Sequence, residues 1–146
     1  METRLLTFEL AEEKYAASVS EVSSILRLGT VTRVPNSEKS MLGLINLRSS
    51  IIPLLSLRRL FRHPEVESGK DARIVVVERQ LEGAKKLQGM LVDRVLDVLN
   101  QEDTELVEGV SIPLSVDRDF FSFFFRWRNS TFAVLNLDRV MASCLD

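Results

Sequence analysis

The chain contains few of the side chains that carry out catalysis or bind metals. It has one histidine, His63, and one cysteine, Cys144, so an internal disulfide is excluded. Nucleophiles and metal sites need partners of suitable type, and neither HxxxH nor CxxC spacing occurs. The phosphate-binding patterns GxGxxG and GxxxxGK are absent as well. We therefore expect no catalytic residues, no metal site and no cofactor, and we interpret His63 as a solvated loop residue.

An arginine in an apolar stretch is a better candidate for a functional side chain. Residues 43–57 are mostly apolar, but Asn46 and Arg48 interrupt them. Two strand-like runs, 44–47 and 51–55, flank a tight connection that contains Arg48. The planar guanidinium keeps its charge and pairs with carboxylates or carbonyls. Arg48 is therefore either a corner residue that tethers the two strands or a contact to a partner.

The strongly aromatic segment 120–127 is a second candidate for binding. Strand alternation divides its side chains between two faces. One face would carry Phe121, Phe123, Phe125 and Trp127, and the other Phe120, Ser122, Phe124 and Arg126. We expect both faces to pack in the core, whereas an exposed aromatic face would mark an interface. With Arg126 and Arg128 nearby, such a face could also stack nucleic-acid bases.

Many short strands with turns between them must position these residues. Apolar alternation and turn residues predict a hairpin over 7–19, strands at 31–34, 44–47, 51–55, 73–78 and 132–137, and a mobile connection over 65–71. A helical turn is expected over 57–61 and an exposed loop over 101–110. Residues 91–99 fit either a helix or a bent strand. The pattern is typical of an all-β fold of the barrel class with short helices.

Two further helices are expected. One covers 19–26, where apolar residues recur at helical spacing after an N-cap serine, Ser18 or Ser20, and Gly29 follows as a stop. The other covers 139–145, with Asp138 as its N-cap.

Length, composition and charge narrow the class of protein. A chain of 146 residues with 45% hydrophobic residues fits one domain or two closely joined subdomains. The net charge of −2 gives no support for electrostatic capture of nucleic acid or of an anionic membrane. No apolar run approaches the ~18 residues of a transmembrane helix, and the first residues do not resemble a secretory signal. A cytoplasmic location is the resulting expectation.

Several segments, in order along the chain, resemble the CheW-like chemotaxis coupling proteins. Residues 43–57 are similar to the family signature Gly-Val-x-Asn-Leu-Arg-Gly and the proline-containing strand after it. Residues 89–99 are similar to its second signature, Gly-x-x-Val-Asp-x-Val-x-x-Val, and the likeness favours bent strands there. Further likenesses cover 6–16, 19–25, 31–37 and 134–140.

The resemblance implies a fold and a non-enzymatic role. The family's fold is two packed five-stranded SH3-like barrels, which implies one domain over 1–146. The first barrel would cover roughly 13–69, and the second roughly 1–12 and 70–146. Family members catalyse nothing and link chemoreceptors to a histidine kinase. The implied partners are the kinase's regulatory domain and the cytoplasmic helical hairpin tip of a receptor, with no nucleic acid and no membrane insertion.

The resemblance also assigns two sets of contact residues. The set that matches the family's receptor-binding groove is Val22, Gly43, Arg48, Ile74 and Val98. The set that matches its kinase-binding surface is Ser23, Ser24, Leu26, Asn46 and Arg48. On residue type alone, the apolar members would be ordinary core and the serines a solvated helix face.

Three residues depart from the family pattern. Ser49 stands where glycine is usual and tolerates a positive φ less well. Ser56 replaces an aspartate and Leu42 a basic residue, so each removes a charge. These changes leave open a divergent CheW-like paralogue in a non-chemotactic pathway, governing surface motility or gene regulation. A regulatory β-barrel that binds a small ligand or nucleic acid is the other alternative.

Overall fold

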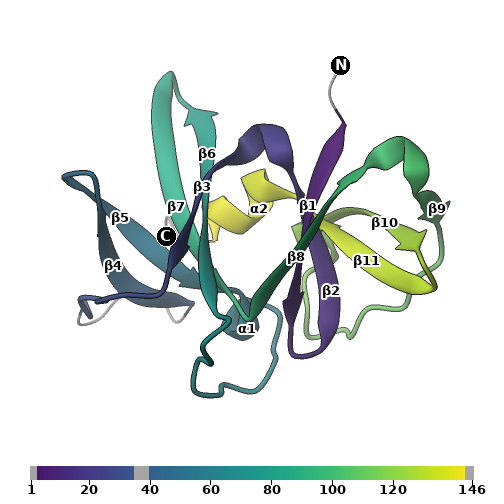
Figure 1. The fold of residues 1–146 in the computed structure, drawn as a ribbon, viewed down its shortest axis with the longest axis horizontal. Coiled ribbons are helices and arrows are strands. Elements are labelled where there is room, and N and C mark those ends of the chain that lie inside the picture. The colour runs from purple at the N-terminus through teal and green to yellow at the C-terminus, as the bar shows by residue number, and fades with distance from the viewer. Residues whose placement is uncertain (1–2, 35–39, 144–146) are drawn as a thin grey trace.

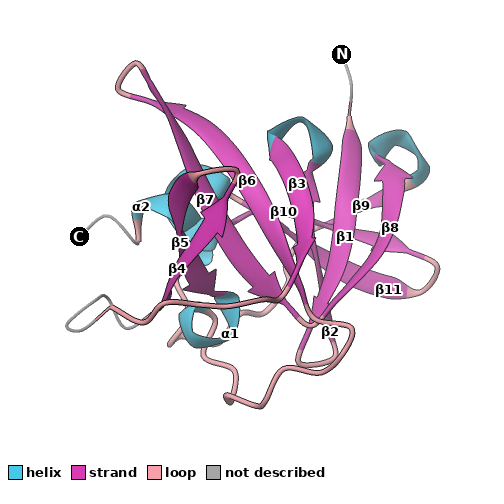
Figure 2. Ribbon diagram, turned by 60° about the vertical axis from the view of Figure 1, so that its left-hand side comes forward, coloured by secondary structure: helices cyan, strands magenta, loops and turns pink. Residues whose placement is uncertain are grey.

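The computed structural model describes residues 3–34 and 40–143, which form two β-sheets that pack against each other (Figure 1). Strands dominate and the helices are short, so the expected all-β class is confirmed (Figure 2). Among the described residues, no helix combines the length and apolar character that crossing a bilayer requires.

The five-stranded sheet holds the middle of the chain, in the spatial order β3, β6, β7, β5, β4. Its strands are β3 (Val22–Arg27), β4 (Met41–Leu47), β5 (Ser50–Ser56), β6 (Arg73–Leu81) and β7 (Ala84–Val92). Thr32, just after β3, bridges Leu44 of β4 through backbone hydrogen bonds of 2.9 and 2.8 Å, which closes the sheet on itself. Gly43 permits this approach, because a Cβ there would lie 2.3 Å from the Thr32 carbonyl oxygen.

The six-stranded sheet contains the first and last strands, in the order β8, β1, β2, β11, β10, β9. Its strands are β1 (Arg4–Leu10), β2 (Glu13–Ser18), β8 (Arg94–Asn100), β9 (Glu105–Val107), β10 (Phe121–Trp127) and β11 (Ser130–Leu135). The edge strands β8 and β9 are joined in the chain by one short 3₁₀ turn, η2 (Gln101–Asp103), so the sheet must curl to bring its edges together. The second sheet therefore has six strands where five were expected.

The division of the chain between the sheets also differs from the implied division at 13–69. β2 lies in the six-stranded sheet, where it pairs with β1 and β11. β6 and β7 lie in the five-stranded sheet, where they pair with β3 and β5. The chain passes from one sheet to the other after β2 and again between β7 and β8.

The largest apolar cluster lies between the two sheets and joins them into one unit. Alternate residues of β6 show how this works. Ile74 and Val76 face the core of the five-stranded sheet, while Val75 and Val77 face the shared cluster. Each buried side chain of this kind contributes about 1.5–3 kcal/mol. Helix α2 (Leu137–Ala142) adds Leu137, Val140 and Met141 to the shared cluster.

Residues 19–27 form no α-helix, so the prediction from helical spacing is wrong. A single 3₁₀ turn, η1 (Val19–Glu21), leads directly into β3, which pairs with β6. The segment also fits a period of two, because Val22, Ser24 and Leu26 are half-buried while the residues between them are exposed. Pairing with β6 supplies hydrogen bonds and burial that so short a helix would lack.

Most other local predictions are confirmed, with differences at the ends of elements. The first hairpin, the β4–β5 pair, β6 and the helical turn α1 (Leu57–Leu60) form as expected. Residues 91–99 contain the end of β7 and most of β8, with a bend at Asp93 between these two strands. The expected loop at 101–110 contains η2 and β9. In place of a strand at 31–34, the described residues there form only the Thr32 bridge.

The terminal helix α2 starts earlier than expected, because Asn136 rather than Asp138 is its N-cap. The Asn136 side chain accepts a hydrogen bond from the Arg139 backbone N–H at 3.4 Å. Cys144 lies outside the described residues.

Both faces of β10 pack against apolar clusters, as expected, but a β-bulge changes which residues share a face. The pairing register with β11 shifts between Phe121 and Phe123. Phe123, Phe125 and Trp127 pack in the core of the six-stranded sheet. Phe121 instead joins Phe124 at the cluster between the sheets, because the bulge reverses the alternation at this point. Phe120 is buried in the short 3₁₀ turn η3 (Arg118–Phe120) that precedes the strand.

Candidate functional site

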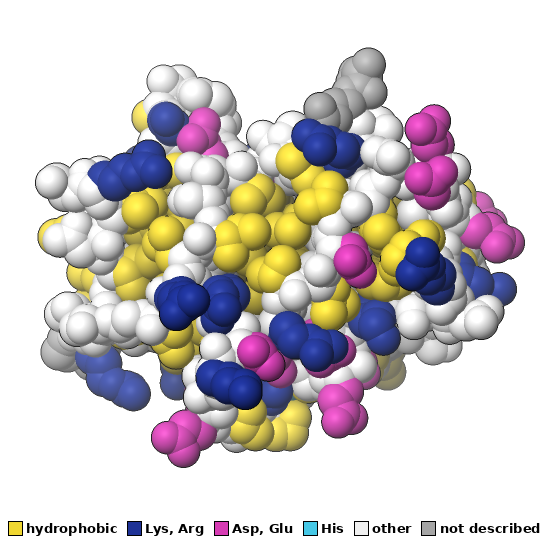
Figure 3. Space-filling model, viewed as in Figure 1, with side chains coloured by type: hydrophobic (Ala, Val, Ile, Leu, Met, Phe, Trp, Pro, Cys, Tyr) yellow, Lys and Arg dark blue, Asp and Glu magenta, His cyan; other side chains and the backbone are white. Residues whose placement is uncertain are grey.

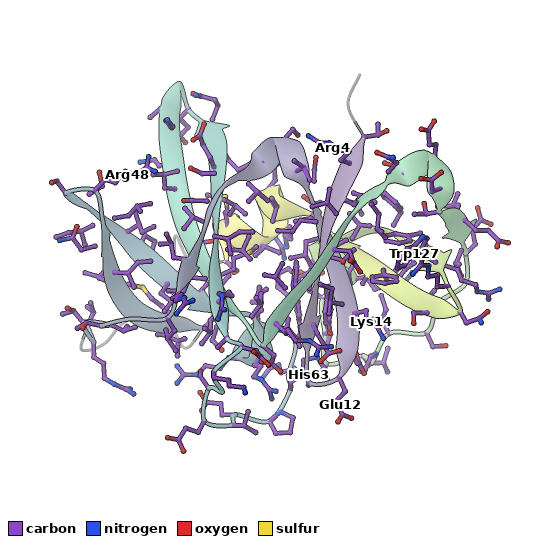
Figure 4. The ribbon with its side chains drawn as sticks, viewed as in Figure 1. Arg4, Glu12, Lys14, Arg48, His63 and Trp127 are labelled. Carbon is purple, nitrogen blue, oxygen red and sulfur yellow. The ribbon has the colours of Figure 1, made fainter. Side chains whose placement is uncertain are left out.

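The outer end of the β4–β5 hairpin presents polar and apolar side chains to solvent. Arg48 and Ser49 form its two-residue turn, with φ values of 49° and 71°, as in the turns that suit the twist of paired strands. Ser49 thus adopts the positive φ expected of the family's glycine, and the tight turn is kept. Figure 4 shows Arg48 at the far end of the hairpin. We call Asn46, Arg48 and Ile51 the hairpin tip.

Ile51 is the member of the hairpin tip that the sequence did not single out. Its side chain is 69% exposed, and it pairs across the hairpin with the exposed Asn46. It begins the apolar run 51–55, in which no alternation indicates which side chain points outward. Only the pairing register identifies it as an outward-facing residue.

A second surface lies on another face of the molecule, between β3 and β8. These are edge strands, one from each sheet, and Figures 1 and 2 show both on the same side. Figure 3 shows hydrophobic side chains gathered over the middle of this face. Ile25 on β3 is 44% exposed and Val98 on β8 is 52% exposed, while Val22 is half-buried. We call Val22, Ile25 and Val98 the β3–β8 surface.

Buried or half-buried polar contacts fix the two strands that carry this surface. At a bulge between β1 and β8, the hydroxyl of the buried Thr7 accepts a hydrogen bond from the Asp97 N–H at 2.9 Å and donates to its carbonyl at 3.1 Å. These bonds hold the backbone directly before Val98. On the other side, Arg79 of β6 pairs with Glu21, the residue directly before β3. Both strands are therefore anchored close to their exposed apolar residues.

An ion pair connects the two sheets at the bend between β7 and β8. Arg58 of α1 donates to both carboxylate oxygens of Asp93, at 3.1 and 2.6 Å, and the Ala11 N–H donates to Asp93 Oδ2 at 2.9 Å. Burial alone would raise the pKa of Asp93, but the hydrogen bonds from Arg58 and Ala11 outweigh it and lower that pKa below its usual value. Asp93 stays ionised and links α1, the bend and the β1–β2 turn.

The residues that the family resemblance assigns to receptor binding lie in three separate places in the structure. Val22 and Val98 lie on the β3–β8 surface, and Arg48 lies on the separate hairpin tip. Ile74 is 2% exposed and packs inside the five-stranded sheet, and Gly43 is buried against Thr32. Neither presents a side chain to a partner in this structure.

The residues that the family resemblance assigns to kinase binding lie in two separate places, the hairpin tip and strand β3. Asn46 and Arg48 share the hairpin tip. Ser23, Ser24 and Leu26 lie on strand β3, rather than on the helix expected there, and so border the β3–β8 surface. Leu26 is half-buried and packs against the core of the five-stranded sheet.

The interpretation of His63 as a solvated residue is wrong. Its side chain is 16% exposed, and Nε2 lies 2.8 Å from the hydroxyl of Tyr15 and 4.0 Å from a carboxylate oxygen of Glu13. His63 follows the end of α1 and packs against the β1–β2 hairpin. No pattern of residue types predicts this contact, because it joins segments that are distant in the chain.

Two curled sheets with a shared core, a hairpin tip of polar and apolar side chains and a separate apolar surface define a double-barrel interaction domain. The comparison with known protein families narrows this class of domain to one family. The chain belongs to the family described as the CheW-like domain, whose sequence profile matches residues 4–144.

Several named proteins are similar to this chain. The chemotaxis protein CheW of Bacillus subtilis is 32% identical over 80% of this chain and 70% of its own length. The chemotaxis protein CheW of Treponema pallidum is 26% identical over 96% and 82%. The crystal structure of the scaffolding protein TtCheW from Thermoanaerobacter tengcongensis has a TM-score of 0.77 and 27% identity, over 93% of this chain and 90% of that one. These names describe chemotaxis and scaffolding proteins, not enzymes.

Proposed function

We propose that this protein is a non-enzymatic adaptor that couples chemoreceptors to a histidine kinase in a bacterial chemosensory array. Its place would be the cytoplasm, at membrane receptors reached through its partners. Family membership and the names of the relatives support a role in chemotaxis. The observation that carries the adaptor role is the presence of two separate exposed surfaces, the hairpin tip and the β3–β8 surface, on one jointly packed unit. Two surfaces allow two partners to be held at once, which raises their effective concentration without any chemistry.

We assign the β3–β8 surface to the helical hairpin tip of a receptor. An amphipathic helix binds by laying its apolar stripe on an apolar surface. Ile25 and Val98 supply that surface, and Ser23 and Arg27 offer polar contacts beside it on β3. Exposed apolar patches on folded proteins commonly mark interaction sites.

We assign the hairpin tip to the kinase's regulatory domain. Ile51 supplies an exposed aliphatic anchor, and the exposed Asn46 and Arg48 supply directional hydrogen bonds around it. An apolar centre with an arginine at its edge is the usual composition of a protein interface.

Titration calorimetry with the two cognate partners tests the proposal. The kinase's regulatory domain should bind with micromolar affinity, or about 8 kcal/mol. The receptor's helical tip should bind the unmodified chain but not Val98→Glu. Val66→Glu is the matched control, since Val66 is 60% exposed in the connection before β6. Absence of heat with both partners at tens of micromolar would refute the adaptor role.

Two of the alternatives drawn from the sequence, a divergent paralogue and a barrel that binds nucleic acid, gain no support from the structure. Ser56 caps α1 by accepting a hydrogen bond from the Arg59 N–H at 3.2 Å, and Leu42 packs against the core, so these departures have structural roles. The Arg128 guanidinium lies 4.4 Å from the Trp127 ring centroid and covers a ring that base stacking would need. The pathway that the adaptor serves, chemotactic or otherwise, depends on its partners.

A further inference from the structure

A recess lies away from both surfaces, at the end of the six-stranded sheet. It has a volume of about 610 Å³ and is walled by the β1–β2 turn, the end of α1, residues 110–116 and the β10–β11 hairpin. Ligand pockets in proteins commonly measure about 300–1,000 Å³. The proposed adaptor role leaves this recess unused. In Figure 4, His63, Lys14 and Glu12 mark its neighbourhood, and Arg48 lies at the opposite end of the molecule.

Aromatic rings form the apolar wall of the recess. Tyr15 and Phe61 stack with centroids 5.3 Å apart, and Phe121 lies 5.1 Å from Phe61 and 5.7 Å from Phe124. Phe121 and Phe124 are only half-buried, so this edge of the cluster remains open to the recess. Such an array favours a flat ring, which gains edge or offset-stacked contacts beyond simple area burial.

The polar end of the recess is a short hydrogen-bonded chain. The Tyr15 hydroxyl donates to Glu13 Oε2 at 3.3 Å and lies 2.8 Å from His63 Nε2. Burial, together with Glu13, raises the pKa of Tyr15, so its hydroxyl keeps its proton. The hydroxyl oxygen of Tyr15 and the carboxylate of Glu13 each keep lone pairs that can accept a further hydrogen bond at this end of the recess.

The charges around the opening balance. Glu12 and Glu13 carry negative charge, and Lys14 and Arg62 carry positive charge. A rim with equal numbers of both signs does not select a net anion or a net cation.

We propose that this recess binds a small neutral aromatic molecule that carries an O–H or N–H donor. The ring lies against Phe121 and Phe124, and the donor reaches the acceptors at the Tyr15–His63 end. This inference is independent of the adaptor role.

Fluorine NMR titration of the full chain with 4-fluorophenol tests the proposal without altering the protein. The probe should show saturable binding. 4-Fluoroanisole has the same ring but no donor, and it should bind about fivefold more weakly, as the loss of one hydrogen bond implies. Equal affinity for both probes, or no saturation by either, would overturn the assignment. So would tighter binding of N-acetyl-tyrosinamide than of 4-fluorophenol, because that would indicate a protein side chain as the occupant.

A pair of adjacent substitutions locates the binding. Phe124 lines the recess, whereas Phe123 packs in the core of the six-stranded sheet. Phe124→Leu should weaken 4-fluorophenol binding about fivefold through loss of a ring contact, and Phe123→Leu should leave it unchanged. Equal effects of the two substitutions would place the probe elsewhere.

Discussion

The ion pair between Arg58 and Asp93 should contribute substantially to the free energy of unfolding. We choose Asp93→Asn, which keeps the shape of the side chain and removes its charge. The carboxylate accepts three hydrogen bonds, two from Arg58 and one from the Ala11 N–H. A hydrogen bond to a charged group contributes about 1.5–3 kcal/mol. The amide that replaces the carboxylate can retain one acceptor oxygen, but it leaves the Arg58 guanidinium, whose side chain is 17% exposed, without its anion.

Because the Arg58–Asp93 pair is partly exposed, Asp93→Asn should reduce the free energy of unfolding by less than the same change would in a fully buried pair. The Asp93 side chain is 32% exposed, so water replaces part of what is lost. We expect Asp93→Asn to cost about 2 kcal/mol, or roughly 6 °C in Tm for a chain of this length. Urea denaturation followed by circular dichroism measures it. Asp97→Asn, a change at an exposed carboxylate on the next strand, should cost less than about 0.5 kcal/mol. Equal losses from the two substitutions would refute the reasoning.

The same ion pair predicts how the difference in unfolding free energy between wild type and Asp93→Asn depends on pH. The pKa of Asp93 is lower in the folded chain than in the unfolded one, so its stabilisation is complete above the unfolded pKa of about 3.9. It is lost as the pH falls from there through the folded pKa. The difference in unfolding free energy between wild type and Asp93→Asn should therefore be constant above about pH 5 and should shrink below about pH 4. A difference that shrank on raising the pH would have the wrong sign for this mechanism.

Three other substitutions test separate parts of the account. Gly43→Ala places a Cβ 2.3 Å from the Thr32 carbonyl oxygen, so it should break the bridge that closes the sheet and cost roughly 3 kcal/mol or more in a urea melt; a loss below ~1 kcal/mol would show that the bridge is dispensable. Ser56→Ala removes the side-chain cap on the Arg59 N–H and should cost about 1 kcal/mol by the same assay, whereas no change would mean that α1 needs no cap. Arg48→Ala should change stability by less than about 0.5 kcal/mol yet weaken binding of the kinase domain at least tenfold by calorimetry, and the reverse pattern would make Arg48 a structural residue.

The class of fold could be predicted from the sequence because its signals are local. The β-branched run in β6 and the turn at Arg48 each identify an element without knowledge of the rest of the chain. The segment that became η1 and β3 could not be read in this way, because its apolar residues fit both a helical and a strand period. Pairing with β6, which lies much later in the chain, decides between them.

The candidate site was less predictable than the fold. The sequence and the family likeness picked out Val98 and Arg48, which the structure exposes. The same likeness picked out Ile74, which lies in the core because β6 is covered on both faces. Ile51 and the contact between His63 and Tyr15 depend on strand register and on the packing of distant segments. Neither of these two features can be recognised from the pattern of residue types in the sequence.

A bridging measurement tests the adaptor role most directly. The helical tip of the cognate receptor is attached to a biosensor, and the kinase's regulatory domain is passed over it with and without this protein. We predict that the kinase domain is retained only when the protein is present. Val98→Glu should abolish capture of the protein itself, and Arg48→Ala should abolish only the second layer. If the two partners instead displaced each other from the protein, a single shared surface would be indicated, and the central claim would be contradicted.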